Sequence, residues 1–491
     1  IQKVAYTLND FTITVARTLQ IKGREVGKFL PIVNYDLPPK PVDIAENEES
    51  KQAWRRAATD IRNKRAAEFK KSCRTRMTME AVERFSKYER FYIPWSFDYR
   101  GRAYPIPAFL TPQDTDFGKS LIRSADESYI TESGKKWLAF QVATTFGLDK
   151  ETMADRLLWT TQNIPLITRV ATDPIDNIGD WEGADEPWQF LAACEEYYSV
   201  VVTKERKTTG LFVATDATCS GLQILAGLAR DKETARLVNV LPSERPQDAY
   251  KVVADTAKPN CPMHIQKVMD RKTVKRTVMT IPYNAKPYSN RSYIRDALLE
   301  KGIEIDKEDL TVTVQAVRDA MQKVVPGPMK VMKWIEDEVG KAIKGGAIEL
   351  QWVTPSGFIV NQRIMKKEKK NVKLQLLGEI QLKIAMDKKE ADINRHKAAT
   401  APNLIHSLDA SLLHLSIDKF DKPIALIHDS VLTQSVDMDE LSAIIRETYM
   451  HLFAEHDYLN DFAQQIGAET EPPIIGDLKP ESVIDSTYFF C

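Results

Sequence analysis

The sequence has few cysteines and no long apolar run. Five cysteines stand among 491 residues, an odd number, widely scattered and without a Cys-x-x-Cys pair. This usage argues against a disulfide framework and against a zinc site, and it fits a reducing compartment. No apolar stretch approaches the roughly 20 residues that span a bilayer, so we expect no membrane segment.

Net charge is also nearly absent. The chain has 68 Lys and Arg against 69 Asp and Glu, a formal charge of −1, so any nucleic-acid role must depend on local basic patches. The chain opens directly with a helical pattern, so we expect no signal peptide. The first residue is Ile and not Met, from which we expect the chain to be part of a longer polypeptide.

Most of the chain has helical periodicity, interrupted by short apolar runs that predict strands. We therefore expect an α+β protein that is mostly helical, with two to four subdomains at this length. Residues 4–30 are predicted to form one helix. Residues 51–76 carry ten Lys and Arg against two acidic residues and predict a pair of basic helices. Such a pair of helices either forms an ordinary solvated surface or binds nucleic-acid phosphates.

Two connecting segments have an unusual composition. Residues 173–188 form an acidic stretch rich in Gly, Pro and Trp, which we predict to lie on the surface. Residues 351–385 are predicted to form a hairpin, with the basic run Lys366–Lys370 at or near its tip. A basic hairpin is usually solvated, but its shape can also enter a DNA groove.

Two predicted strand segments deliver an aspartate. Gly210–Asp216 is an apolar run that closes on a carboxylate, and residues 423–433 form two strands around a turn at His428 and Asp429. Each aspartate has an ordinary explanation, as a helix N-cap or as a turn residue. If the strands are neighbours, the carboxylates could instead hold Mg²⁺, which needs few protein ligands. Nucleotidyl transfer uses two such ions, on the attacking hydroxyl and on the triphosphate.

The segment Asp270–Tyr283 carries cations at helical spacing. Arg271 and Lys275 are four residues apart and would share one face of a helix, and Tyr283 comes round near that face eight residues later. A solvated basic face explains the pattern equally well. Opposite a metal-bound triphosphate, however, the two cations would neutralise charge, and Lys275 could donate a proton to the leaving pyrophosphate.

Six motifs occur in order along nearly the whole chain. They are Asp98-Tyr-Arg-Gly-Arg102-Ala-Tyr104, Asp216 with Cys219-Ser-Gly-Leu-Gln223, Leu241-Pro-Ser-Glu244 with Gln247-Asp-Ala-Tyr250, Arg271-x-x-x-Lys275-x-x-Val-Met-Thr-x-x-Tyr283, Ala401-Pro-Asn-Leu-Ile-His-Ser407 and Ile427-His-Asp-Ser430. The second, fourth and sixth are similar to polymerase motifs A, B and C. In their details the motifs resemble the single-subunit, bacteriophage-type RNA polymerases, a group that includes mitochondrial enzymes.

The resemblance implies a right-hand fold, with an antiparallel-sheet palm and helical fingers and thumb. The expected division is the end of an N-terminal domain or the start of the thumb at 1–35, a basic thumb at 36–89, the palm with motif A at 90–244, the fingers with motif B and the hairpin at 245–406, and the palm with motif C and a C-terminal foot at 407–491. The hairpin resembles the family's promoter-reading loop. Most of the family's N-terminal promoter-binding domain would be missing.

The resemblance also implies roles for individual residues. Asp216 and Asp429 would hold two Mg²⁺ ions, helped by the backbone carbonyl of Ala217, and with Lys275 they would be the catalytic residues. The resemblance implies that the incoming nucleoside triphosphate is bound by five residues, Lys150, Arg271, Lys275, Tyr283 and His406. It further implies that Arg100, Arg102 and Tyr250 contact nucleic acid.

The same comparison favours RNA over DNA synthesis. Related DNA polymerases carry a glutamate five residues after the first aspartate, where it blocks a ribose 2′-OH, but that position here is Gly221. Tyr283 with His406 is the family's pair for meeting the 2′-OH, although a lone histidine is more often structural. Two departures concern this site. Asn284 stands where the family usually has glycine, and Pro282 should end or kink the helix before the tyrosine.

The predicted function is DNA-templated RNA synthesis from ribonucleoside triphosphates, by a monomer that acts on promoter-containing double-stranded DNA and nascent RNA. The alternatives are a related DNA polymerase and a nucleic-acid-binding fragment without promoter-initiation activity. We expect a viral origin, in a podovirus phage and with a cyanobacterial host as a further guess. The enzyme would then act in the cytoplasm of the infected bacterium.

Overall fold

The computed structural model describes residues 1–31, 35–374, 380–473 and 476–490. Helices make up most of this part of the chain, and its strands pair in six small antiparallel sheets. The predicted α+β class with mostly helical content is confirmed. No described helix combines the length and the apolar character that a membrane crossing needs.

The elements follow one another without a repeating pattern. The first part of the chain holds β1 (Ala5–Leu8), α1 (Asp10–Lys22), α2 (Glu48–Phe85), β2 (Phe91–Tyr92), β3 (Trp95–Phe97), β4 (Ala103–Pro105), α3 (Asp116–Ser120), β5 (Ile122–Ser124), β6 (Ser128–Tyr129), α4 (Glu132–Phe146), α5 (Met153–Gln162), α6 (Ile164–Thr172), α7 (Pro187–Tyr197) and β7 (Thr208–Thr209). The second part holds β8 (Phe212–Thr215), α8 (Ser220–Ala229), α9 (Lys232–Leu237), α10 (Ala249–Ala257), α11 (Met263–Gln266), α12 (Arg271–Thr280), α13 (Pro287–Leu299), α14 (Lys307–Val324), α15 (Pro326–Lys344), β9 (Leu350–Val353), β10 (Ile359–Gln362), β11 (Met365–Leu374), β12 (Ile380–Ala391), α16 (Ile393–Asp418), β13 (Ile424–Ile427), β14 (Ser430–Gln434), α17 (Met438–Ala454) and α18 (Tyr458–Ile466).

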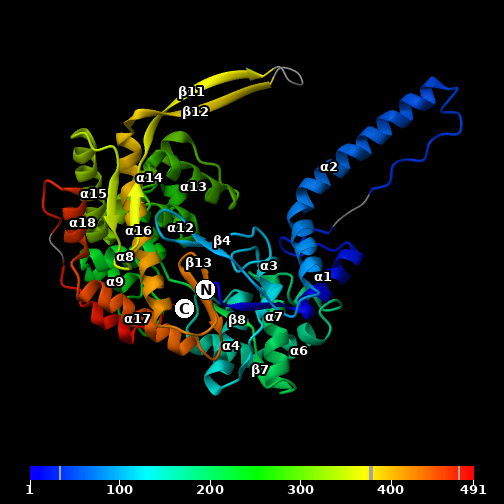
Figure 1. Cartoon of the computed structure of the whole chain (residues 1–491), viewed down its shortest axis with the longest axis horizontal. Helices are drawn as coiled ribbons and strands as arrows, with labels where there is room; N and C mark the ends of the chain where they lie inside the picture. Colours follow the sequence, from blue (N-terminus) through cyan, green and yellow to red (C-terminus); the bar gives the residue numbers. More distant parts are fainter. Residues whose placement is uncertain (32–34, 375–379, 474–475, 491) are drawn as a thin grey trace.

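Two long elements, α2 and the hairpin β11–β12, extend from the body of the molecule (Figure 1). Helix α2 is a single helix of 38 residues, whereas the sequence predicted a pair. The prediction of a break was wrong because residues 48–85 contain neither proline nor glycine, the residues that most strongly interrupt a helix. Asn47 caps its start by accepting from the backbone N–H groups of Glu49 and Ser50.

The predicted single helix at residues 4–30 was also wrong. The segment begins with β1, the middle strand of the sheet β2-β1-β5, in which Tyr6 is fully buried. Asn9 then caps α1 by accepting from the backbone N–H of Thr12, and Gly23 ends the helix with a left-handed φ of 65°. The apolar spacing persists across this boundary because strand and helix bury their side chains in one core.

The predicted hairpin at residues 351–385 is two hairpins in succession. β9 pairs with β10, and the longer β11 then pairs with β12. The run Lys366–Lys370 lies in the outgoing strand β11. Residues 375–379, which follow β11 in the sequence, lie outside the described residues, as do residues 32–34 beside the domain boundary predicted near residue 35.

The prediction that the acidic segment 173–188 lies on the surface was wrong for part of the segment. Trp181 and Trp188 are fully buried. Each indole N–H is paired, Trp181 Nε1 donating to the Pro174 carbonyl at 2.8 Å and Trp188 Nε1 to the Val26 carbonyl at 3.1 Å. A large aromatic ring whose N–H is hydrogen-bonded stabilises the core when it is buried. This gain keeps the two tryptophans inside although the neighbouring residues are acidic.

A sheet of order β13-β14-β8 joins residues 212–215 to residues 424–434. Helix α16, 26 residues long, packs against α8, α15 and α17 beside it. The C-terminal segment returns to the same place, because Phe490 forms a bridge with Ala217 and Gln223 Nε2 donates to the Phe489 carbonyl at 3.0 Å. Chain segments far apart in sequence thus meet just after β8.

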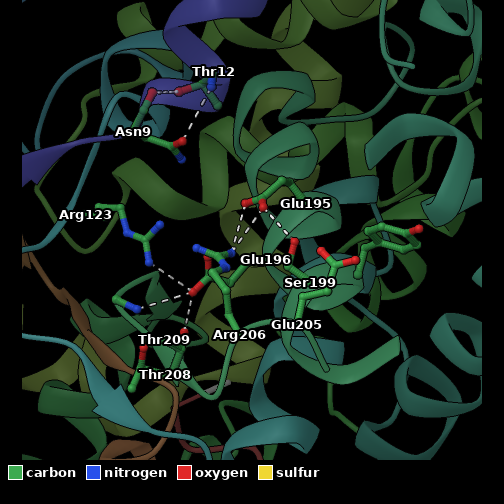
Figure 2. Close-up of polar contacts among 12 residues, drawn as sticks. Asn9, Thr12, Arg123, Glu195, Glu196, Ser199, Glu205, Arg206, Thr208 and Thr209 are labelled. Atoms are coloured by element: carbon green, nitrogen blue, oxygen red, sulfur yellow. Dashed lines mark hydrogen bonds and ion pairs between the residues drawn. The ribbon is translucent and has the colours of Figure 1, made fainter. Parts of the chain in front are cut away.

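A buried ion-pair network ties α7 to β5 and β7 (Figure 2). Glu196, whose side chain is 2% exposed, accepts from Arg206 at 2.7 Å and from the hydroxyl of Thr209 at 2.7 Å. Arg123 approaches the same carboxylate at 3.4 Å. Glu195 accepts from Arg206 at 3.1 Å on the other side. The buried carboxylate of Glu196 therefore forms ion pairs with both Arg123 and Arg206.

We expect Glu196→Gln to lower the free energy of unfolding by about 2 kcal/mol, because Arg206 and Arg123 lose the carboxylate they share and each keeps only its second partner, Glu195 or Glu127. The midpoint of thermal unfolding measures this loss and should fall by about 2 °C. Glu205→Gln is the matched control, since Glu205 lies nearby but is exposed and should change stability by less than about 0.5 kcal/mol. Equal midpoints for the two variants would contradict the network's role.

Candidate active site

The two predicted aspartates lie at the ends of neighbouring strands. β8 pairs with β14 and β14 with β13, and Val431 stands opposite Thr215. Asp216 follows β8, and Asp429 lies in the turn between β13 and β14. Ser430 Oγ donates to Asp216 Oδ1 at 2.6 Å and so links the two strand ends directly. The prediction that these strands are neighbours is confirmed.

The turn that carries Asp429 is tight because His428 adopts a left-handed φ of 57°. Histidine is one of the few non-glycine residues that occupies this region with some frequency. The ring of His428 packs against Tyr104, with 5.3 Å between ring centroids. This contact holds the turn against the β3–β4 hairpin.

The carboxylate of Asp216 opens onto a cavity but is surrounded by protein on its other sides. Desolvation by these atoms, and next the charge of Asp429, raise the pKa of Asp216 to about 6, while the hydroxyl of Ser430 and the charge of Lys150 oppose the shift. A carboxylate pushed toward its neutral form by a second carboxylate is a place where a bound cation relieves the repulsion.

The donor set suits a hard divalent cation. In the part of the chain that the structure describes, no group of three or more His, Cys, Asp and Glu side chains could hold a metal ion. Mg²⁺, however, keeps several waters and is often held by only one or two carboxylates together with substrate phosphates. Asp216 and Asp429 fit that requirement, and Ala217 follows Asp216 in a β-bridge with Phe490.

A cavity of about 440 Å³ lies beside Asp216, and the predicted cations Lys150 and Arg271 line it. Arg271 Nε donates to Asp248 Oδ2 at 2.6 Å, and its guanidinium lies over the ring of Tyr250 at 5.4 Å from the centroid. Both contacts fix the guanidinium in the cavity wall. A cavity that places Asp216 together with Lys150 and the fixed guanidinium of Arg271 can hold a metal-bound polyphosphate.

Lys275 lies one turn after Arg271 on α12, so the predicted common face is confirmed. The residue is solvent-accessible, but protein atoms on one side still desolvate its ammonium group. This desolvation, followed by the charges of Arg271 and Lys150, lowers the pKa of Lys275. An ammonium group whose pKa is lowered toward the working pH is a better proton donor than an ordinary lysine.

Tyr283 and His406 lie ring to ring, with centroids 4.6 Å apart and planes inclined by 33°. Gly221 on α8 faces the phenol, because a Cβ built at Gly221 would come within 2.9 Å of Tyr283 Oη. The structure thus brings together Gly221 from α8, Tyr283 from the turn that follows α12, and His406 from α16. Any side chain at position 221 would push the tyrosine hydroxyl from its place.

Helix α12 ends at Thr280, just before Pro282, as the proline predicted. The Ala285 N–H donates to the Thr280 carbonyl at 3.0 Å and the Asn284 N–H to the Ile281 carbonyl at 2.8 Å, the two bonds of a Schellman ending. Asn284 has the left-handed φ of 60° that this ending requires. Asparagine tolerates that conformation, which explains how it can stand where the resemblance leads us to expect glycine.

Arg100 and Arg102 lie beside the tyrosine–histidine pair. Arg102 Nε donates to Asp409 Oδ1 at 3.1 Å, and Arg102 Nη2 also contacts Asp409 Oδ2. Arg100 is held by Asp98 and reaches His406. Their predicted contact with nucleic acid stays a prediction, as does that of Tyr250, which lies buried under Arg271.

Sequence reasoning missed the acidic residues that hold the cations. Asp248 stands in the quoted Gln247–Tyr250 motif but received no role, and Asp409 lies three residues after His406 on the same helix. Ser430 was quoted only as part of motif C. Each lies within three positions of a residue that was singled out, and a search for acidic residues near the predicted cations could have found Asp248.

Comparisons with known proteins identify the family of the chain. The sequence pattern of the DNA-dependent RNA polymerase family matches residues 128–488, so the chain belongs to that family. It is 29% identical to the DNA-directed RNA polymerase of Enterobacteria phage K11, over 100% of this chain and 62% of the relative. It is 28% identical to the T7 RNA polymerase of Escherichia phage T7, over 100% of this chain and 63% of the relative.

Organellar proteins match as well. The chain is 27% identical to the DNA-directed RNA polymerase 2, chloroplastic/mitochondrial, of Arabidopsis thaliana, over 99% of this chain and 50% of the relative. The chain therefore spans between half and about two thirds of the length of these relatives.

Proposed function

We propose that the protein synthesises RNA on a DNA template, by transferring nucleotides from ribonucleoside triphosphates to an RNA 3′-OH with release of pyrophosphate. The observation that carries the proposal is the placement of Asp216 and Asp429 at adjoining strand ends, with Asp216 lining the same cavity as Lys150 and Arg271. Family membership supports the same chemistry.

In this proposal the residues divide the work. Asp216 and Asp429, with the Ala217 carbonyl, hold divalent cations, which we propose to be two Mg²⁺ ions. When bound, such ions lower the pKa of the attacking hydroxyl and neutralise charge on the phosphates. Lys150 and Arg271 orient the triphosphate from the opposite wall. Lys275 donates a proton to the leaving pyrophosphate as a general acid.

The larger assembly is also a proposal. The β13-β14-β8 sheet would be the core of a palm, α12 and its neighbours the fingers, and α2 the thumb of a right-hand polymerase, in the division expected from the sequence. The partners would be promoter-containing double-stranded DNA, nascent RNA and ribonucleoside triphosphates, bound by a monomer. The phage relatives support action in the cytoplasm of an infected bacterium. The podovirus and cyanobacterial assignments stay predictions.

Primer extension on a preassembled RNA–DNA scaffold tests the function without requiring a promoter. With Mg²⁺ and ribonucleoside triphosphates, the RNA primer should lengthen according to the template strand. Tight scaffold binding without extension would instead support a binding protein. Extension with deoxynucleoside triphosphates at the same efficiency would support a DNA polymerase.

We expect Tyr283→Phe to lower discrimination between ribo- and deoxyribonucleotides by about 10–100-fold, because a buried polar partner for the 2′-OH is lost. The measurement is the ratio of kcat/KM for matched ribo- and deoxynucleoside triphosphates in single-nucleotide addition. Tyr288→Phe, a matched change at an exposed position of α13, should leave the ratio unchanged. An unchanged ratio in Tyr283→Phe would remove the sugar-selecting role of the tyrosine.

A further inference from the structure

The contact between Arg100 and His406 determines which ring nitrogen of the histidine carries the proton. Arg100 Nη1 lies 2.6 Å from His406 Nδ1. A guanidinium has donors only and does not lose its proton in proteins, so Arg100 must donate and His406 Nδ1 must accept. His406 is therefore neutral with its single proton on Nε2. In the described part of the chain, this Nε2–H meets no protein acceptor.

Arg100 is itself fixed, so the contact is not a chance position of a flexible side chain. Asp98 Oδ2 accepts two charge-assisted hydrogen bonds from Arg100, from Nε at 3.0 Å and from Nη2 at 2.6 Å, and these fix the guanidinium. Asp98 Oδ1 accepts from the backbone N–H groups of Arg100 and Arg102. The turn between them closes through Gly101, whose φ of 95° a residue with a side chain rarely adopts.

The surroundings of His406 also favour its neutral form. The charged or titratable groups that face it are Arg100 and Arg102 from the β3–β4 turn, His428 from the β13–β14 turn, and the Tyr283 ring. Asp409, on the same helix, is engaged with Arg102. Burial, followed by the charges of Arg102, Arg100 and His428, lowers the pKa of His406 to about 2.

We propose that Arg100 is a positioning residue for sugar selection, which holds His406 as the Nε2–H tautomer and so presents a hydrogen-bond donor beside Tyr283. This inference rests on the proposed function of Tyr283 and His406 as the pair that meets the ribose. A ribose 2′-OH can accept from Nε2–H, whereas a deoxyribose has no oxygen there and leaves the donor unpaired. The opposite tautomer would present a lone pair in place of this donor.

The test combines nuclear magnetic resonance of the ring nitrogens with nucleotide discrimination. In protein labelled with ¹⁵N-histidine, the His406 signals are assigned by their loss in His406→Gln. Wild type should show the pure Nε2–H tautomer between pH 6 and pH 8. Arg100→Met, which removes the donor but keeps an unbranched side chain, should show a mixture of tautomers, and Arg100→Lys, again with donors only, should restore the wild-type pattern.

Discrimination supplies the functional readout. Arg100→Met should lower the ratio of kcat/KM for ribo- over deoxyribonucleotides by about 10-fold, the loss of one hydrogen bond. The same change in a His406→Ala background should have little further effect, because the two residues act as one unit. Arg90→Met is the matched control, since Arg90 forms a salt bridge with Asp126 at the surface and should leave the ratio unchanged.

Three outcomes would overturn the proposal. The first is a wild-type His406 that is charged or protonated on Nδ1. The second is an equal loss of discrimination from Arg100→Met with and without His406, which would place Arg100 in direct contact with nucleic acid. The third is a wild-type ratio in Arg100→Met despite mixed tautomers. If His406→Ala alone leaves the ratio unchanged while wild type shows the Nε2–H tautomer, the sugar-selecting pair fails and the tautomer assignment stands.

Discussion

Asp216→Asn and Asp429→Asn are each expected to lower the rate of RNA extension by about 1,000-fold or more, which corresponds to about 4 kcal/mol of transition-state stabilisation. Asparagine keeps the size of the side chain and one acceptor oxygen but removes the charge that holds a divalent cation. Extension of a labelled primer on the RNA–DNA scaffold, followed at saturating nucleotide, measures the effect.

The same variants should remain folded and should still bind the scaffold. Desolvation and the charge of Asp429 raise the pKa of Asp216 from 3.8 to about 6, so ionising Asp216 costs the metal-free protein stability as the pH rises through this range. The sign follows from linkage, since a carboxyl whose pKa is raised on folding costs stability wherever it is ionised. Without divalent cations at pH 8, either variant should therefore unfold at the wild-type temperature or above it.

Asp421→Asn provides the control for this pair. Asp421 lies just before β13, and its side chain is 82% exposed beside Lys422. Its loss should leave both extension and stability unchanged. If Asp216→Asn or Asp429→Asn extends the primer at a rate near that of wild type, the assignment of these residues as metal ligands is wrong. Loss of scaffold binding together with extension would show a folding defect and not a chemical one.

The features of the site that depend on neighbouring residues in the sequence could be predicted. An apolar strand that ends on Asp216, a strand turn at Asp429 and a four-residue spacing of cations are all local features, and the structure confirms the strands and the helix. The end of α12 was equally local, because Pro282 cannot continue the hydrogen-bonding pattern.

Features that depend on distant segments could not be predicted in this way. Arg102 is paired with Asp409, 307 positions along the chain, and no periodicity connects them. The buried tryptophans in segment 173–188 are another example, since their burial depends on the segments that cover them. Strand β1 was predicted as helix because a four-residue strand bordering a helix has too few alternations to set a period.

Arg271 and Lys275 share one helix face but should differ in function, and this contrast gives the second large effect. Asp248 holds the Arg271 guanidinium, so Arg271 is suited to binding and Arg271→Met should mainly raise KM. No described acidic side chain forms a salt bridge with Lys275, and its pKa is lowered by partial burial and by the charges of Arg271 and Lys150. Lys275 is therefore the better candidate for a proton donor.

We expect Lys275→Met to lower kcat by about 100–10,000-fold, the range over which a positioned general acid contributes. Lys275→Arg should keep KM near its wild-type value but lose most of kcat, because a guanidinium carries the charge and does not give up its proton. Single-turnover addition of one nucleotide, measured between pH 6 and pH 10, separates these effects.

The pH profile provides the sharpest check on this role. A general acid works in its protonated form, so the wild-type rate should fall at alkaline pH below the ordinary lysine pKa of 10.5, and this fall should be absent in Lys275→Arg. Lys272→Met is the control on the same helix, since Lys272 is 75% exposed and lies near Glu300. A Lys275→Arg variant with wild-type kcat would restrict Lys275 to binding the triphosphate, and the pyrophosphate would then have to take its proton from water.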